Sequence, residues 1–335
     1  MKRFLPIIAV IGIVVVSIAC WMPRTINGEK PRRLLKSAAQ SGEKYSYVAD
    51  GTTRILCRGR LVTSEMKVYH LKPNRTRIEY SSEPLKGVVA GEDGVCSWRC
   101  DPKMKKTVVA GCVSSAKCDR PMNLLLENHR IDVYKSADVA GRPAMLLVLQ
   151  STSGQVRKRL WIDKSTFVVL RSEEYDTAGR VESASSFRRI EYVDSLSPSL
   201  FKRPCNSHGR TQRIETATMT EAELSKIVGF TISKPAYVPV GYKPEGYRVY
   251  NCPCGCGHKA AYTRFTNGLN SISVFEYRDC TECGCCKGMS ESHESCCVNE
   301  NDQGKEAIVT VHGRTIIVIG DISRDEAERM ANSFK

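Results

Sequence analysis

Cysteine and histidine side chains gather in two segments near the C-terminal end of the sequence, where they could support metal or redox chemistry. Nine of the 16 cysteines lie in CPCGCGH at 252–258 and CTECGCCKGMSESHESCC at 280–297. Thiolates and imidazoles at such short spacings suit a tetrahedral zinc ion or a thiolate-rich copper(I) ion. The candidate ligands are Cys252, Cys254, Cys256, His258, Cys280, Cys283, Cys285, Cys286, His293, Cys296 and Cys297.

The N-terminal residues bear on how these cysteines are used. The basic residues Met1-Lys2-Arg3 are followed by the apolar run FLPIIAVIGIVVVSIA at 4–19. A short positive segment before an apolar core is typical of a secretory signal peptide. We therefore predict that residues 1–22 are a cleaved signal peptide or a membrane anchor, with lipidation of Cys20 as a third outcome. The protein is expected in the periplasm or cell envelope of a bacterium.

Export favours disulfides over metal binding for the cysteines, because paired thiols become oxidised outside the cytoplasm. Neighbours such as Cys285 and Cys286 strain the backbone if they pair with each other, so each is expected to link elsewhere. Nine is an odd number, which leaves one thiol free, joined to another chain or joined to an N-terminal cysteine. The N-terminal cysteines are Cys57, Cys96, Cys100, Cys112, Cys118 and Cys205. We expect no cofactor, with zinc or copper as the alternative.

No catalytic motif accompanies these cysteines. The sequence holds no G-x-S-x-G, P-loop, G-x-G-x-x-G or H-E-x-x-H pattern. We therefore expect a binding protein rather than an enzyme.

The net charge of +14 is confined to the first part of the chain. Residues 1–205 hold 35 Lys and Arg against 20 Asp and Glu, whereas residues 206–335 hold 15 against 16. An exported protein rarely meets nucleic acid, so the expected partners are acidic lipid, lipopolysaccharide or an acidic protein segment. The alternative is that the excess charge only aids solubility.

The first part of the chain is predicted to consist mainly of short strands. A helix is expected from Pro31 to near Gly42, and a second near 121–129 interrupts the strands. About ten antiparallel strands in series predict a sheet curled towards a barrel. The strand segments are 54–62, 66–71, 75–80, 94–100, 106–112, 131–137, 144–150, 157–163, 167–175 and 182–192. Candidates for an apolar cavity on its inner face, or simply for sheet core, are Val68, Ile78, Trp98, Leu147, Trp161 and Val169.

A second, smaller α+β unit follows a polar linker at 205–219. Capping boxes at Thr220 with Glu223 and at Ser323 with Glu326 predict two helices. Strands are expected at 230–233, 247–252, 259–265, 272–279, 307–313 and 314–321. The domains are thus predicted at 30–204 and 220–335, the second carrying the cysteine-rich loops.

Several segments resemble a known family. GRPA at 141–144, the run RLWIDKSTFVVLRSEEYDTAGRVESASSFRRIEY at 159–192 and LFKRP at 200–204 resemble the MucB/RseB family of envelope-stress regulators. HLKPNRTRIEY at 70–80 and DGVCSWRCDPKMKKTVV at 93–109 resemble the same N-terminal domain, which is similar to the carriers LolA and LolB. PAYVPVGYKP at 235–244 and TIIVIGDISRDEAERMANSF at 315–334 resemble its C-terminal domain.

The resemblance implies a mainly β protein: a LolA-like curved antiparallel half-barrel with helices on its concave side, plus a smaller α+β domain. It also implies a regulator that binds the periplasmic region of an anti-sigma factor, or a lipid signal in an apolar cavity. The alternatives are a lipid or lipoprotein carrier and a thiolate metal or redox sensor. Association with a second copy of the chain stays open.

Overall fold

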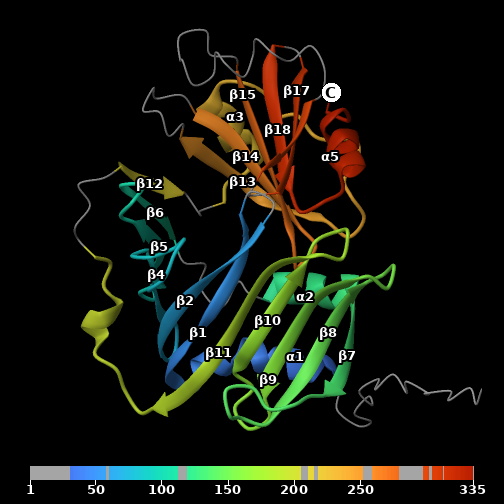
Figure 1. The fold of residues 1–335 in the computed structure, drawn as a ribbon. Coiled ribbons are helices and arrows are strands. Elements are labelled where there is room, and N and C mark those ends of the chain that lie inside the picture. The colour runs from blue at the N-terminus through green and yellow to red at the C-terminus, as the bar shows by residue number, and fades with distance from the viewer. Residues whose placement is uncertain are drawn as a thin grey trace, which may run out of the picture.

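Two mainly antiparallel sheets, each with helices, make up the protein (Figure 1). The computed structural model describes residues 31–57, 60–111, 119–204, 210–214, 218–251, 259–278, 297–301, 304–311 and 313–334. The predicted signal segment lies outside this range. Among the described residues, no helix has both the length and the apolar composition that crossing a bilayer requires.

The first sheet has 12 strands in the order β12-β6-β5-β4-β3-β2-β1-β11-β10-β9-β8-β7. Its strands are β1 (Ser46–Cys57), β2 (Arg60–Leu71), β3 (Arg75–Tyr80), β4 (Val89–Glu92), β5 (Cys96–Asp101), β6 (Lys106–Gly111), β7 (His129–Lys135), β8 (Ala144–Ser151), β9 (Val156–Asp163), β10 (Val169–Tyr175), β11 (Val181–Val193) and β12 (Arg210–Ile214).

The chain builds this sheet from two meanders, β1 to β6 and β7 to β11, that join where β1 pairs with β11. Helix α2 (Asp119–Asn128) falls between them in sequence, so the predicted helical break is the crossover between the two halves. The curved antiparallel sheet and its helical break confirm the predicted fold class (Figure 1).

Three details differ from the expected strands. The segment at 54–62 is not one strand, because the chain passes there from β1 to β2. Strand β4 was not expected. The expected linker at 205–219 contains β12, which pairs with β6 and is parallel to it.

Two helices cover the concave side of the second half of this sheet. Helix α1 (Pro31–Ala39) has Pro31 at its first position, where the missing N–H costs nothing. It buries Leu34, Leu35 and Ala38 in a cluster with Leu125 and Leu126 of α2 and with apolar residues of β7, β8 and β9. Short 3-10 turns lie at Ser41–Glu43 and Pro198–Phe201.

The second sheet has six strands in the order β13-β14-β15-β18-β17-β16. These are β13 (Lys243–Asn251), β14 (Lys259–Thr266), β15 (Ser271–Arg278), β16 (Cys297–Asn301), β17 (Gly304–Val311) and β18 (Arg314–Gly320). Helices α3 (Glu221–Val228) and α5 (Arg324–Ala331) begin at the two predicted capping boxes, which are both formed.

One expected strand of the second domain is wrong. Residues 230–233 are not in a strand. Ile232 instead packs with Leu224 of α3 and Ala261 of β14. The N–H and hydroxyl of Ser233 both donate to the buried carboxylate of Glu276, at 2.9 Å each. The carboxylate of Glu276 thus accepts the hydrogen bond from the Ser233 N–H that a neighbouring strand would accept in a sheet.

The turn between β14 and β15 connects the two domains. Its Leu269 packs against the core of the first domain. The side-chain amide of Asn128, at the end of α2, donates to the carbonyls of Gly241 at 3.1 Å and Asn267 at 3.3 Å.

An ion pair lies in the same joint. Arg157 is the extra residue where the register of β8 and β9 shifts, and its guanidinium pairs with Asp321 after β18. A bulge re-aims the side chain of the bulged strand, here across the domain boundary.

Candidate functional site

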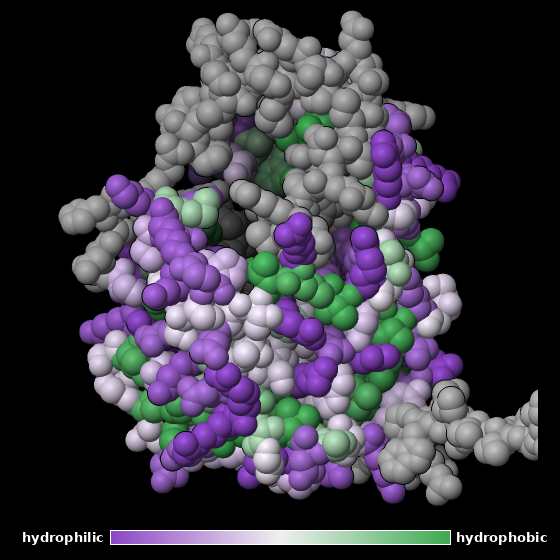
Figure 2. Space-filling model, in the orientation of Figure 1, coloured by the Kyte–Doolittle hydropathy of each residue, from purple (hydrophilic) through white to green (hydrophobic). Residues whose placement is uncertain are grey.

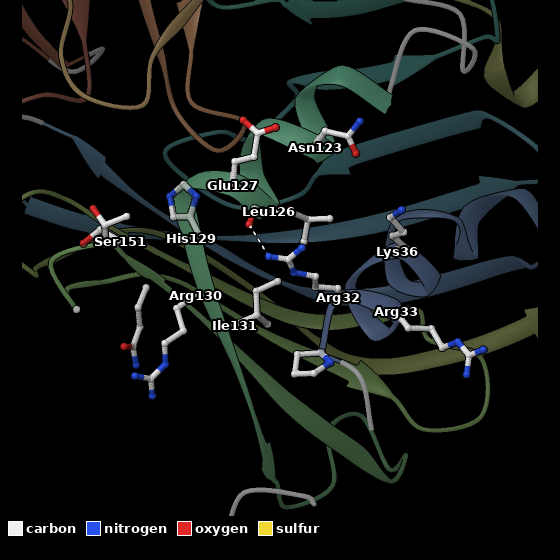
Figure 3. Close-up of a pocket in the computed structure, with 14 residues that line it drawn as sticks. Arg32, Arg33, Lys36, Asn123, Leu126, Glu127, His129, Arg130, Ile131 and Ser151 are labelled. Carbon is white, nitrogen blue, oxygen red and sulfur yellow. Dashed lines mark hydrogen bonds between the residues drawn. The ribbon is translucent and has the colours of Figure 1, made fainter. Parts of the chain in front are cut away.

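A pocket of about 1110 Å³ lies in the first domain between α1, α2 and the edge strand β7 (Figure 3). We call it the basic pocket. Ligand pockets for small molecules usually measure about 300–1,000 Å³, so this one could hold a sizeable group. The lining comes from the first turns of α1, one face of α2, the start of β7 and the turn after β8.

Helix α1 supplies the positive charge of the basic pocket. Because Leu34, Leu35 and Ala38 of this helix point into the core, Arg32, Arg33 and Lys36 are left exposed on its other side. Arg32 donates to the carbonyl of Leu126 at 3.3 Å, which joins α1 to α2 (Figure 3). No carboxylate among the described residues forms an ion pair with these three cations.

Strand β7 supplies a neutral imidazole and a paired guanidinium. Burial lowers the pKa of His129 below its ordinary value, although the hydrogen bond from its Nδ1 to the Leu125 carbonyl opposes the change and nearby Arg157 adds to it. His129 is therefore mainly uncharged at neutral pH. Arg130 holds Asp132 through two hydrogen bonds, of 3.0 and 2.8 Å.

The remaining wall is partly apolar. Pro31, Leu126 and Ile131 line the same space as the cations. Glu127 is the one carboxylate among the described lining residues, and it pairs with Lys243 of the second domain at 3.3 Å. Four cationic side chains beside apolar surface suit a ligand that combines negative charge with an apolar part.

The six predicted cavity residues divide between the two faces of the first sheet. Directly opposed residues on neighbouring strands share a face. Val68 opposes Ile78, and Leu147 opposes Leu160. The pairing registers of β1, β11 and β10 connect these two pairs and show that they lie on the same face of the sheet. Val169 lies on this face too, which is the side that α1 covers.

Both tryptophans lie on the other face, so that part of the prediction is wrong. Trp98 opposes Gly91 and is one residue out of phase with Ile78. It is buried against Gly91, where an added Cβ would lie 2.8 Å from the indole. Trp161 alternates with Leu160 and Ile162, and the guanidinium of Arg171 stacks 4.4 Å from its ring.

The four residues on the concave face are core and do not line the basic pocket. Leu147 and Val169 belong to the cluster under α1, and Val68 and Ile78 to a second cluster with Ala49 and Met66. The residues that do line the pocket were missed, although the amphipathic pattern of 31–39 was visible. The opposite, convex face is mainly hydrophilic with scattered hydrophobic areas (Figure 2).

The predicted metal or disulfide residues lie outside the described residues, except that the backbone of Cys297 begins β16. Within the described ranges, no three His, Cys, Asp or Glu side chains converge as metal ligands would. Cys96 and Cys100 of β5 have free thiols. The structure therefore gives no support to a zinc or copper site.

Comparison with known proteins identifies the fold. No protein-family model matches the sequence, and no curated protein matches it either. Among solved structures, MucB in complex with MucA(peri) matches 91% of this chain and 98% of its own, at a TM-score of 0.62 and 15% identity. The Pseudomonas aeruginosa MucA/MucB complex gives 0.61 at 15% identity. MucB described without MucA gives 0.51 at 16% identity. The chain therefore has a fold like that of MucB, as the resemblance predicted.

Proposed function

We propose that this protein is an extracytoplasmic regulator that holds the periplasmic region of an anti-sigma factor. The observation that carries the proposal is the MucB fold, which extends over both domains rather than over a carrier-like first domain alone. MucB forms a complex with MucA(peri), and a protein with the same two domains in the same order is suited to the same kind of partner.

The similarity to the MucA complexes supports the proposal. Identity and coverage hardly differ among the three MucB structures, but the TM-score is higher for the two MucA complexes than for MucB described alone. The structure of this chain is thus more similar to those of the two MucA complexes than to that of MucB described alone. The basic pocket gives an acidic segment of such a partner a place to bind.

Export is part of the proposal. The basic and apolar residues 1–19 would direct the chain to the periplasm or leave it anchored in the membrane. There the proposed partner region and acidic envelope lipids are both accessible.

The test is a binding titration of the purified exported chain with the periplasmic region of its cognate anti-sigma factor, with that of MucA as a second probe. Saturable binding that weakens as salt rises from about 50 to 300 mM is expected, because exposed charges are screened beyond about 10 Å. If neither probe forms a complex at low salt, the proposal is wrong.

A second candidate function is binding of an anionic amphiphile, as in a lipid or lipoprotein carrier. The observations that favour it are the size of the basic pocket and the presence of Leu126 and Ile131 in its lining together with the cations. A short-chain phosphatidylglycerol titrated into the protein should then compete with the anti-sigma region. If it binds and the anti-sigma region does not, the carrier function replaces the regulator.

A further inference from the structure

Strand β7 (His129–Lys135) is a free edge of the first sheet. It stands last in the strand order and pairs over its whole length with β8 alone. Every second residue of such a strand turns its N–H and C=O away from the sheet. Among the described residues, no backbone group outside β8 bonds to residues 130–135.

This edge lacks two of the features that can prevent another strand from adding. It contains no proline, and its register with β8 has no bulge. The edge strand β13 of the second sheet differs on both points. It carries Pro244 and a register shift between Pro244 and Tyr247, and its Tyr247 carbonyl already accepts from the N–H of Met219 at 2.9 Å.

The surroundings of β7 specify the chemistry of a strand that would add there. Ile131 and Val133 point to the concave side, where they pack with the cluster under α1. The first residues of β7 line the basic pocket together with Arg32, Arg33 and Lys36 of α1, so a chain along the edge meets these cations where it enters the pocket (Figure 3). Such a chain would carry apolar groups beside Ile131 and Val133, and carboxylates at the end that enters the basic pocket.

We propose that β7 binds an extended acidic segment of a protein partner as an added strand, which runs into the basic pocket. This proposal rests on the proposed function, since it says how the partner would be held. A polypeptide fits better than a lipid because the edge offers alternating backbone donors and acceptors, which only another backbone can match in register.

A peptide with alternating apolar residues in the middle and carboxylates at both ends tests the edge directly. The probe is fluorescein-labelled Glu-Glu-Val-Thr-Val-Thr-Val-Glu-Glu amide, titrated into the purified full chain and followed by anisotropy; glutamates at both ends serve either strand direction. Two versions carry N-methyl groups, one on the valine amides and the other on the threonine amides. Only one set of amides faces β7 in an added strand, so one version should bind at least about tenfold more weakly and the other like the parent, given the cost of lost hydrogen bonds.

Variants of the protein test the pocket end. The double variant Arg33→Gln, Lys36→Gln should bind the parent peptide about three- to tenfold more weakly, from the loss of two charge contacts. Lys164→Gln, Arg189→Gln removes the same charge at exposed positions that do not line the pocket, and should bind normally. Hydrogen exchange should slow in residues 130–135 when the peptide is bound.

The outcomes separate this proposal from the proposed function. If both methylated peptides bind equally, or residues 130–135 gain no protection, strand addition is refuted. If the anti-sigma region still binds, the function stands and the binding mode fails. If the peptide behaves as expected and the anti-sigma region does not bind, β7 is a peptide-binding edge for a different protein partner. Binding of anionic vesicles without binding of the peptide also refutes strand addition.

Discussion

At the scale of single residues, Asp163 shows how one buried carboxylate holds together a corner of the first domain. Its oxygens accept from Arg142 Nε at 2.7 Å, from the N–H of Ser165 at 2.8 Å and from the hydroxyl of Tyr192 at 3.2 Å. Burial alone would raise the pKa of Asp163, but the hydrogen bonds from Arg142 and Ser165 outweigh it and lower the pKa to about 2.

Replacing this charge should therefore cost stability. We expect Asp163→Asn to lower the free energy of unfolding by about 1–3 kcal/mol at pH 7, because Arg142 and Tyr192 lose a charged acceptor in a buried site. Urea unfolding followed by circular dichroism measures the change. The matched variant Asp194→Asn, at an exposed position, should leave the midpoint unchanged.

The effect should depend on pH in one direction. The pKa of Asp163 is lower in the folded than in the unfolded chain, so the stabilisation is complete above the unfolded pKa near 4 and disappears as pH falls towards 2. The difference between wild type and Asp163→Asn should shrink over that interval. A difference that stays constant down to pH 2 would contradict this account.

At the scale of elements, α5 depends on its first residue. The Ser323 hydroxyl accepts from the N–H of Glu326 at 3.2 Å, and the Glu326 carboxylate accepts from the N–H of Ser323 at 3.2 Å. Two otherwise unpaired amides are satisfied in this way. The helix packs Ala327, Met330 and Ala331 into the core of the second domain, so its start also sets that packing.

Loss of the cap should be measurable. Ser323→Ala is expected to destabilise the protein by about 1 kcal/mol in urea, since the amide of Glu326 loses its acceptor. Ser323→Thr keeps a hydroxyl at the same place and should recover most of the loss. Equal midpoints for Ser323→Ala and wild type would show that the box contributes nothing.

At the scale of the whole molecule, the joint between the domains is a packed contact. Leu269 reaches the first core, and Asn128, beside pocket residues Glu127 and His129, bonds to two loops of the second domain. The pocket and the joint therefore share the end of α2. A ligand that moves this end of α2 therefore changes both the basic pocket and the joint between the domains.

Shortening Leu269 should loosen the joint. For Leu269→Ala we expect a loss of about 1–2 kcal/mol, smaller than for a fully buried leucine. The radius of gyration from small-angle scattering should also rise. Ile227→Ala, which shortens a side chain that is 43% exposed on α3, is the control and should change neither quantity. Unchanged scattering from Leu269→Ala would mean that other contacts suffice.

The cysteine-rich loops give a prediction for the exported protein. We expect them to be linked by disulfides, since loops rich in Gly, Ser and Glu bury too little apolar surface to order themselves. Thiol counting after denaturation, together with metal analysis, decides the matter. One free thiol or none in the loops, without metal, agrees with disulfides. Four or more free thiols with about one zinc or copper per chain would favour the sensor instead.

The sequence by itself determined the features that depend on local chemistry. The capping boxes at Thr220 and Ser323, the strands between turn residues and the helical break before β7 all follow from residues a few positions apart. Resemblance extended these local patterns to the MucB fold. Such features can be predicted from the sequence because each depends only on residues close to it in the chain.

Only the tertiary structure decided which residues meet. The face of a strand residue depends on register with strands far along the chain, which is why Trp98 and Trp161 were assigned to the wrong face. Strand order made β7 an edge, and packing of α1 against it brought Arg33 and Lys36 to the pocket. Leu269 enters the other domain's core for the same reason. Contacts of this kind join residues far apart in the chain, such as Arg32 and Leu126, and no local pattern encodes them.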